Sequence, residues 1–333
     1  MLDERRAAIL SAVVGEYIET AQPVGSGRVA RNPDIDVSPA TVRNDMAQLE
    51  QEGYLHQPHT SAGRIPTDKG YRFFVDSLVD PAPLDEVQRH LVGGFFARAH
   101  GALEEMLHDT SRLLSALTDY AAVVVGPNRD DATIRSVELV GLSGHTALVV
   151  TVLSNGTITK SALELAEETP EERLAAASSQ VRAFVQGATL HALPAVVATG
   201  DARVDEICLA AVEALRAGSH HDAEQVFVGG ASRMARAFDA VETVRQVLGI
   251  LEQQYVVVGL LRDVLDRGQS VAIGTEHGLQ QLAECSVVVA PYRVEGEPGG
   301  TLGVLGPTRM HYPQALAAVA MVSQRLGRHL SER

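Results

Sequence analysis

Hydrophobic residues recur at helical spacing near the start of the chain, and this pattern predicts a helix over residues 3–19. Ile9, Val13 and Tyr17 lie four residues apart, so they would share one face of that helix and turn toward a core. The sequence Gln22–Gly25 contains proline and glycine, which interrupt a helix. A short second helix is expected to follow this break.

A third helix is predicted to end at about Gly53. Ser38 can accept a hydrogen bond from a free N–H group of its first turn, and Pro39 suits the first helical position, where a missing N–H removes no hydrogen bond. Gly53 can end the helix in the left-handed conformation. An apolar stripe at positions i, i+4 and i+7 faces inward, namely Val42, Met46 and Leu49.

The following residues predict a strand pair and a fourth helix. Residues 54–56 are expected to form a strand, residues 61–64 a tight turn, and Thr67 the cap of a helix over residues 68–78. A short helix, a turn and a longer helix are typical of helix-turn-helix proteins, in which the longer helix enters the major groove. A strand pair after that helix forms a wing. We therefore predict a winged helix-turn-helix domain over residues 1–78.

The outward face of the third helix carries side chains that suit the edges of DNA bases. Arginine can form paired hydrogen bonds with guanine, and asparagine or glutamine with adenine, in the major groove. A solvated helix face would show the same residue types. The predicted base-reading residues are Ser38, Thr41, Arg43, Asn44 and Gln48. Lys69 and Arg72 in the fourth helix are predicted to hold the DNA backbone, and Arg64 at the tip of the wing is predicted to reach the backbone or an adjacent minor groove.

The rest of the chain predicts an α+β protein of several domains. Asp80–Pro83 would form a hinge, and residues 103–117 keep the spacing of a connecting helix. Short apolar runs predict strands at 123–125, 133–140, 146–152, 157–163, 270–274, 286–290 and 301–305. We expect these strands to form an antiparallel sheet flanked by helices from both ends of the chain. A mostly helical insertion interrupts them, and a long helix over residues 239–267 returns the chain to the sheet.

Composition supports a folded protein, and charge bears on its partner. Hydrophobic residues make up 45% of the 333 residues, and the two cysteines suggest neither a disulfide framework nor a zinc site. We see no signal peptide and no run of 18 apolar residues, so we expect a cytoplasmic protein with no membrane span. The net charge of −14 argues against nucleic acid. Local charge matters more, however, because phosphates respond to charges within roughly 10 Å at ordinary salt.

Three motifs in order resemble the family of heat-inducible transcription repressors HrcA. They are PVGS at Pro23–Ser26, the run from VSPATVRNDMAQLE at Val37–Glu50 through GYLHQPHTSAGRIPTDKGYRFFVDSL at Gly53–Leu78, and GTLGVLGPTRMHY at Gly300–Tyr312. The chain departs from the family pattern at Gly27, which separates PVGS from the basic Arg28. This departure puts a phosphate contact at the start of the second helix in question.

The resemblance implies a division of the chain and a function. The division is a winged-helix domain at 1–78, a connecting helix and the first part of a GAF-like domain at 79–169, an inserted dimerising domain at 170–244, and the second part of the GAF-like domain at 245–333. The implied function is repression of chaperone genes by a homodimer that binds an inverted-repeat operator in double-stranded DNA. The chaperonin is implied as the partner that modulates repression.

Two other classes of function remain open from the residues alone. A winged-helix regulator whose GAF-like domain binds a metabolite would share these features, and the glycine-rich segment Gly300–Arg309 would line its pocket. Close backbone packing and tight turns explain the same glycines. An enzyme is not predicted, because no catalytic constellation is present. We also expect neither a cofactor nor a bound metal.

Overall fold

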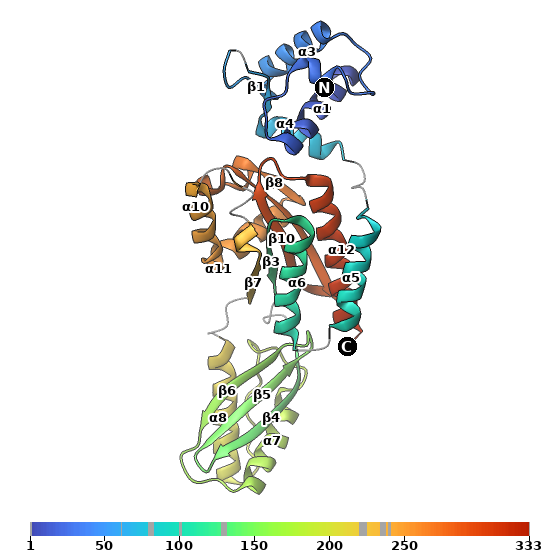
Figure 1. Ribbon diagram of the computed structural model, residues 1–333. Coiled ribbons are helices and arrows are strands. Elements are labelled where there is room, and N and C mark those ends of the chain that lie inside the picture. Colours follow the sequence, from blue (N-terminus) through green and yellow to red (C-terminus); the bar gives the residue numbers. More distant parts are fainter. Residues whose placement is uncertain are drawn as a thin grey trace.

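The computed structural model describes residues 2–60, 62–78, 83–99, 102–127, 132–219, 225–233, 238 and 241–332. Figure 1 shows three units stacked along one direction: an N-terminal unit, a central unit with a five-stranded sheet, and a third unit with a three-stranded sheet. No helix within these ranges is long and apolar enough to cross a membrane. The chain is a mixed helix and sheet protein, as predicted.

The N-terminal unit contains three helices, a two-stranded hairpin and a fourth helix. Its elements are α1 (Glu4–Thr20), α2 (Ser26–Val29), α3 (Pro39–Gln51), β1 (Leu55–His56), β2 (Ile65–Pro66) and α4 (Asp68–Asp76). The two strands pair antiparallel, with Leu55 opposite Pro66 and His56 opposite Ile65. The order of elements predicted for this part of the chain is therefore observed.

The helix ends in this unit lie where local sequence signals place them. The Ser38 hydroxyl accepts a hydrogen bond from the N–H of Thr41 at 3.2 Å, and the Thr67 hydroxyl accepts one from the N–H of Gly70 at 3.2 Å. Gly53 follows α3 with a φ of +79°, a conformation that glycine adopts without strain. Capping side chains and one glycine thus set the bounds of α3 and the start of α4.

The central unit is built around an antiparallel sheet in the order β7-β3-β10-β9-β8. Its strands are β3 (Ala121–Val125), β7 (Val226–Gly229), β8 (Val271–Ile273), β9 (Cys285–Val294) and β10 (Glu297–Pro307). One face is covered by α6 (Leu103–Thr118) and α12 (Tyr312–Ser331), with α5 (Glu86–Arg98) packed on α12. The other face is covered by α10 (Val241–Leu251) and α11 (Gln254–Asp266). Alternate residues along the strands enter the two hydrophobic clusters, as the pleat of a sheet requires.

The third unit is a separate sheet with its own helices. Its strands β4 (Ile134–Ser143), β5 (Thr146–Leu153) and β6 (Ile158–Glu164) pair antiparallel in that order. Helices α7 (Glu171–Val185) and α8 (Ala202–Ser219) pack on this sheet and enclose a core distinct from those of the central unit. The chain leaves and re-enters the central unit at one point, because the N–H of Gly126 donates to the carbonyl oxygen of Gln225 at 2.8 Å.

The structure differs from the sequence-based expectation in the extent of the insertion. The strands predicted between residues 133 and 163 form, but they belong to the inserted unit and not to the central sheet. The described part of the inserted unit is residues 132–219, not 170–244, and it is not mostly helical. The alternation of apolar residues identified these strands correctly, but it carried no information about which sheet they join.

Two further predictions concern the long helix that returns to the sheet and the hinge after the N-terminal unit. The long helix predicted over residues 239–267 is divided, because α10 ends at Leu251 and α11 begins at Gln254. The hinge expected at Asp80–Pro83 has its first three residues outside the described ranges.

Candidate nucleic-acid interface

Helix α3 is held in place by its apolar face and by an ion pair with α1. Val42 and Leu49 are completely buried. Asp45 lies on the same face, is 5% exposed, and accepts a hydrogen bond from Nε of Arg5 at 2.9 Å. An unpaired buried carboxylate would be costly, so Arg5 fixes α3 on α1. This pair was not predicted, although an acid within the apolar stripe indicates that a cation must lie nearby.

The opposite face of α3 is open to solvent. The side chains of Arg43, Asn44 and Gln48 are exposed, and no hydrogen bond or ion pair joins them to any residue that the structure describes. The hydroxyls of Ser38 and Thr41 lie 3.0 Å apart at the N-terminus of the helix. The structure therefore brings the five predicted base-reading residues together on one helix and its cap.

Arg64 and Lys69 each have a partner within the N-terminal unit, and Arg64 lies next to the start of β2, bridged to Val24, and not at the tip of the hairpin as expected. Nε of Arg64 donates to Oε2 of Glu50 at 2.8 Å, and its side chain is only 17% exposed. Nζ of Lys69 donates to the carbonyl oxygen of Glu52 at 2.8 Å and lies 4.2 Å from the centre of the Tyr54 ring. Arg64 must therefore give up an ion pair to reach DNA, whereas Lys69 keeps an exposed ammonium group.

Arg72 lies away from the other predicted residues and contacts the central unit. Its Nε donates to Oε1 of Glu276 at 2.9 Å, and a second hydrogen bond joins Nη2 to the other carboxylate oxygen. Nη2 also donates to the carbonyl oxygen of Val271 in β8 at 2.9 Å. The expectation that Arg72 holds the DNA backbone is not met in this arrangement, because its guanidinium is bound to a residue 204 positions away.

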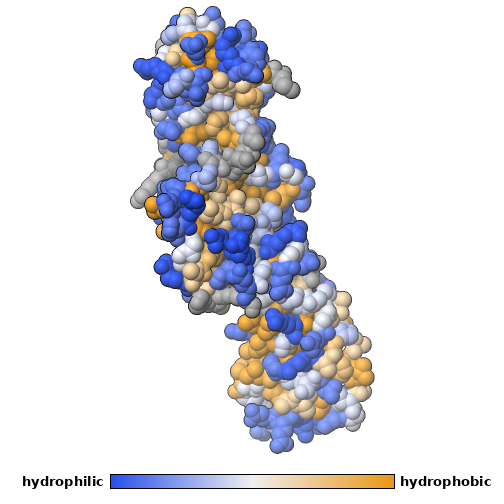
Figure 2. Space-filling view, turned by 90° about the vertical axis from the view of Figure 1, so that its right-hand side faces the viewer, coloured by the Kyte–Doolittle hydropathy of each residue, from blue (hydrophilic) through white to orange (hydrophobic). Residues whose placement is uncertain are grey.

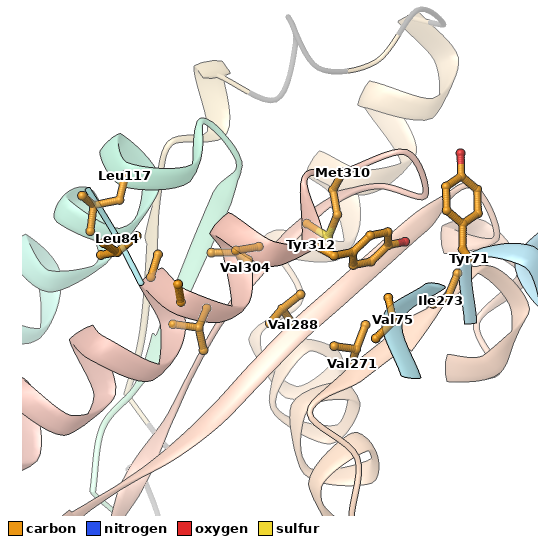
Figure 3. Packing of buried hydrophobic residues seen from close by; sticks show 14 of the residues in the cluster. Tyr71, Val75, Leu84, Leu117, Val271, Ile273, Val288, Val304, Met310 and Tyr312 are labelled. Atoms are coloured by element: carbon orange, nitrogen blue, oxygen red, sulfur yellow. The ribbon is translucent and has the colours of Figure 1, made fainter. Parts of the chain in front are cut away.

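Apolar residues of α4 extend this contact into the core of the central unit. Figure 3 shows Tyr71 and Val75 beside Val271, Ile273 and Tyr312, and these residues belong to one continuous hydrophobic cluster. The rings of Tyr71 and Tyr312 lie 6.0 Å apart between centroids. The N-terminal unit is thus packed on the central unit and not merely tethered to it.

A glycine makes close approach possible at the edge of the same contact. Asp68 Oδ2 accepts hydrogen bonds from the N–H of Thr275 at 3.2 Å and from its hydroxyl at 3.3 Å. Gly274 has a φ of +55°, and a Cβ there would lie 2.2 Å from the same carboxylate oxygen. Glycine is therefore required at position 274 for both its backbone conformation and the space beside Asp68.

The docking contact lowers the pKa of Glu276. Burial by itself would raise the pKa of the Glu276 carboxyl. Hydrogen bonds from Arg72 and from the N–H of Ile273, together with the charge of Arg72, outweigh burial and hold that pKa below its ordinary value of 4.5. The hydrogen bond to Glu276 also raises the pKa of Arg72. Both side chains are thus charged at neutral pH.

Known proteins that resemble this chain match it along its whole length. The family described as HrcA protein C terminal domain matches residues 104–316. The heat-inducible transcription repressor HrcA of Acidothermus cellulolyticus is 39% identical over 339 residues, which cover 100% of each chain. The protein of the same name from Nocardioides sp. is 39% identical over 343 residues, again covering 100% of each chain.

One solved structure has the same fold throughout. It is a crystal structure described as that of a hypothetical protein at 2.2 Å resolution. It covers 100% of this chain and 99% of its own, with a TM-score of 0.71 and 24% sequence identity. The arrangement of all three units is therefore shared with an experimentally determined protein.

The first prediction concerns the ion pair that joins the N-terminal and central units. R72Q and E276Q should each lower the free energy of unfolding at pH 7, and a double-mutant cycle should give a coupling of about 1 kcal/mol, since both side chains are partly exposed. Because the folded state lowers the pKa of Glu276, this stabilisation is complete above pH 4.5 and is lost as the pH falls through the lower folded-state value. Urea unfolding at pH 7 and at about pH 3 measures both effects.

A matched exposed pair provides the control for this cycle. Arg112 and Asp109 form an ion pair with side chains 67% and 44% exposed, so R112Q and D109N should show little coupling at either pH. A coupling between Arg72 and Glu276 that is zero at pH 7, or that grows on acidification, would contradict the prediction.

Proposed function

Because the chain belongs to the HrcA family of heat-inducible transcription repressors, we propose that α3 reads an inverted-repeat operator in double-stranded DNA. The observation that carries the proposal is the solvent-facing surface of α3, where Arg43, Asn44 and Gln48 have no partner among the described residues. Major-groove reading needs such side chains on a helix that is itself firmly held. The N-terminal unit, with its hairpin after α3, is in this proposal a winged helix.

The remaining predicted residues receive different roles. Ser38 and Thr41 lie at the N-terminus of α3, where free backbone N–H groups favour a phosphate. Lys69 has an exposed ammonium group for the DNA backbone, and Arg64 reaches the backbone only by leaving Glu50. Arg72 stays with the central unit and contributes to the orientation of α3 instead of to DNA affinity.

The second prediction separates base reading from general charge effects. R43A and N44A should each weaken operator binding by about 1–3 kcal/mol and relax specificity at particular base pairs. R325A is the matched control, because Arg325 is an exposed arginine of α12 in the central unit and has no ion pair with any described residue. Sites selected from random DNA, followed by titrations of each variant on the recovered site, give both quantities.

The control should bind the selected operator like the parent protein at the same salt concentration. If R43A and N44A also retained full affinity and specificity, α3 would not be the reader.

We further propose that the inserted unit joins two copies of the chain. Burial alternates along β5, so one side of the sheet faces α7 and α8 and the other side is open. The open side carries exposed apolar residues: Val140 is 46% exposed and Ile158 is 53% exposed, and Val150 lies on the central strand between Glu138 and Lys160. Figure 2 shows hydrophobic residues gathered over this lowest unit. Apolar patches of this kind mark protein interfaces, and two-fold pairing is the commonest arrangement of identical chains.

The third prediction tests this interface with point substitutions. A V150K/I158K variant should be monomeric, because two-fold packing would bring four ammonium groups into one apolar contact. V87K is the matched control, since Val87 is 78% exposed on α5 and lies outside the inserted unit. Sedimentation velocity at several concentrations gives the oligomeric state of both variants.

An excision variant tests the same proposal independently. Residues 128–224 can be replaced by a short flexible linker, because Gly126 and Gln225 are already joined by a backbone hydrogen bond. This variant should also be monomeric and should bind the operator more weakly, since two tethered reading helices gain roughly 10²–10⁴ in effective affinity. A folded but dimeric V150K/I158K protein would place the interface elsewhere.

We also propose that the chaperonin assists this assembly in the cytoplasm. A monomer exposes the apolar side of the inserted sheet, and a dimer covers it. A chaperonin that binds apolar surface would hold the monomer until it pairs, and heat-unfolded proteins would compete for that chaperonin and relieve repression. This mechanism does not require the GAF-like fold that the family resemblance implies for the central unit.

The fourth prediction concerns the active fraction of the repressor. Operator titrations should show more active dimer when chaperonin is present and less when an unfolded competitor is added, with the intrinsic operator affinity unchanged. The V150K/I158K variant should not respond, because it cannot pair. Equal active fractions in all conditions for the parent protein would remove the chaperonin from the mechanism.

A further inference from the structure

The ion pair between Arg64 and Glu50 lies beside the outward face of α3. Arg43, Ala47 and Glu50 are spaced at i, i+4 and i+7, so they follow one line along the helix. At the end of this line, Nε of Arg64 donates to Oε2 of Glu50 at 2.8 Å. A carboxylate and a guanidinium are therefore paired next to the surface that is proposed to read DNA.

The backbone of Arg64 is fixed, so an exchange of partners requires only its side chain to move. The N–H of Arg64 donates to the carbonyl oxygen of Val24, and the N–H of Val24 donates to the carbonyl oxygen of Arg64, both at 2.9 Å. A Cβ at Gly63 would lie 2.4 Å from the carbonyl oxygen of Val24, so this glycine allows the close approach. Val24 directly precedes Gly25, the N-cap of α2. In helix-turn-helix proteins the helix before the reading helix crosses the DNA backbone. Arg64 is thus anchored beside the segment that would lie nearest to phosphates.

The two acids of α3 differ in whether their ion pairs can be exchanged. Asp45 has a side chain that is only 6% exposed, so loss of Arg5 would leave a buried carboxylate without a partner. The side chain of Glu50 is 32% exposed, and water can hydrate its carboxylate when Arg64 leaves. A phosphate can therefore replace Glu50 at Arg64, whereas Asp45 must stay paired.

We propose that Glu50 competes with the operator for Arg64 and thereby limits the affinity of the N-terminal unit for DNA. The inference rests on the proposed function, since it concerns the same surface. In the free protein the Glu50 carboxylate holds the guanidinium. In the complex a DNA phosphate takes the place of the carboxylate, and Glu50 is released to solvent. Glu50 is thus a positioning residue that acts through Arg64.

This exchange predicts a particular dependence of operator binding on salt. An arginine that contacts a phosphate of duplex DNA releases about 0.9 of a counterion. When the arginine must first leave Glu50, the freed carboxylate attracts cations from solution, and this uptake offsets part of the release. Removal of the carboxylate should therefore tighten binding and steepen the decrease of affinity with salt. Simple repulsion between Glu50 and DNA would act equally with and without Arg64, so a double-mutant cycle separates the two causes.

Operator titrations of the full-length protein at several salt concentrations test the proposal. The variants are E50Q, R64Q and E50Q/R64Q, and the DNA is the site recovered by selection. At low salt, E50Q should bind about two- to fivefold tighter for each N-terminal unit, which is the range for a partly exposed ion pair, and its salt dependence should be steeper. R64Q should bind more weakly than the parent. E50Q/R64Q should bind like R64Q, because Glu50 acts through Arg64.

E19Q is the matched control for the change in net charge. Glu19 is an exposed glutamate at the end of α1 and has no ion pair with any residue in the described ranges. E19Q should bind the operator like the parent, and circular dichroism and the unfolding temperature show whether each variant is folded. The comparison of E50Q with E19Q decides the question even if R64Q lowers stability.

Three results would overturn the role of Glu50. They are an E50Q variant that binds like the parent, an E19Q variant that binds as tightly as E50Q, and an effect of E50Q that is the same with Arg64 and with glutamine at position 64. A folded parent protein that binds no selected site would instead overturn the proposed function, so the two failures are distinguishable.

Discussion

The direction in which α3 faces depends on the contact between α4 and the edge of the central sheet. Within the N-terminal unit, α3 is fixed by its buried face and by Asp45 with Arg5. The unit as a whole is then placed by Arg72 on Glu276 and by Tyr71 against Tyr312. The Arg72 guanidinium has three acceptors in the central unit at the edge of an apolar cluster, and its hydrogen bonds are directional in a way that apolar packing is not. The orientation of the proposed reading helix is therefore set by a contact that lies outside the N-terminal unit.

The central sheet connects this contact with the inserted unit. β8 lies at one edge and supplies the carbonyl of Val271 to Arg72. β7 lies at the opposite edge and begins next to Gln225, which pairs with Gly126 at the root of the insertion. The strands between these edges are continuously paired, so the sheet is a stiff spacer between the reading unit and the proposed dimer contact. The spacing of two half-sites would follow from the width of this sheet.

Local elements of this protein could be predicted from sequence, and the partners of those elements could not. Ser38, Thr67 and Gly53 set helix ends through contacts within a few residues, so α3 and α4 were found with nearly correct bounds. The strands β4 to β6 were also found. Their assignment to the central sheet was wrong, because alternation of apolar residues defines a strand but not its neighbours.

The candidate site shows the same division between local and distant information. The five residues on α3 and its cap share a surface because helical periodicity places them there. Arg72 was grouped with them because it is basic and close in sequence, but its partner Glu276 is 204 residues away. The spacing of residues within 1–78 therefore could not predict this ion pair. Long-range ion pairs decide which cations of a basic patch remain available, and they appear only in the folded chain.

The distribution of charge in the N-terminal unit gives a physical reason for the proposed pairing of two copies. Most of its arginines are already matched with carboxylates within the described residues: Arg5, Arg6, Arg28, Arg64 and Arg72. Three basic side chains of this unit have no such match there: Arg31, Arg43 and Lys69. Phosphate contacts supply much of the affinity of any DNA-binding protein, and so few available cations give one unit little of it. Under the proposed function, an acidic protein with this surface would gain strong binding by presenting two units to one operator at a fixed spacing, so that each proposed reading helix would benefit from the binding of the other.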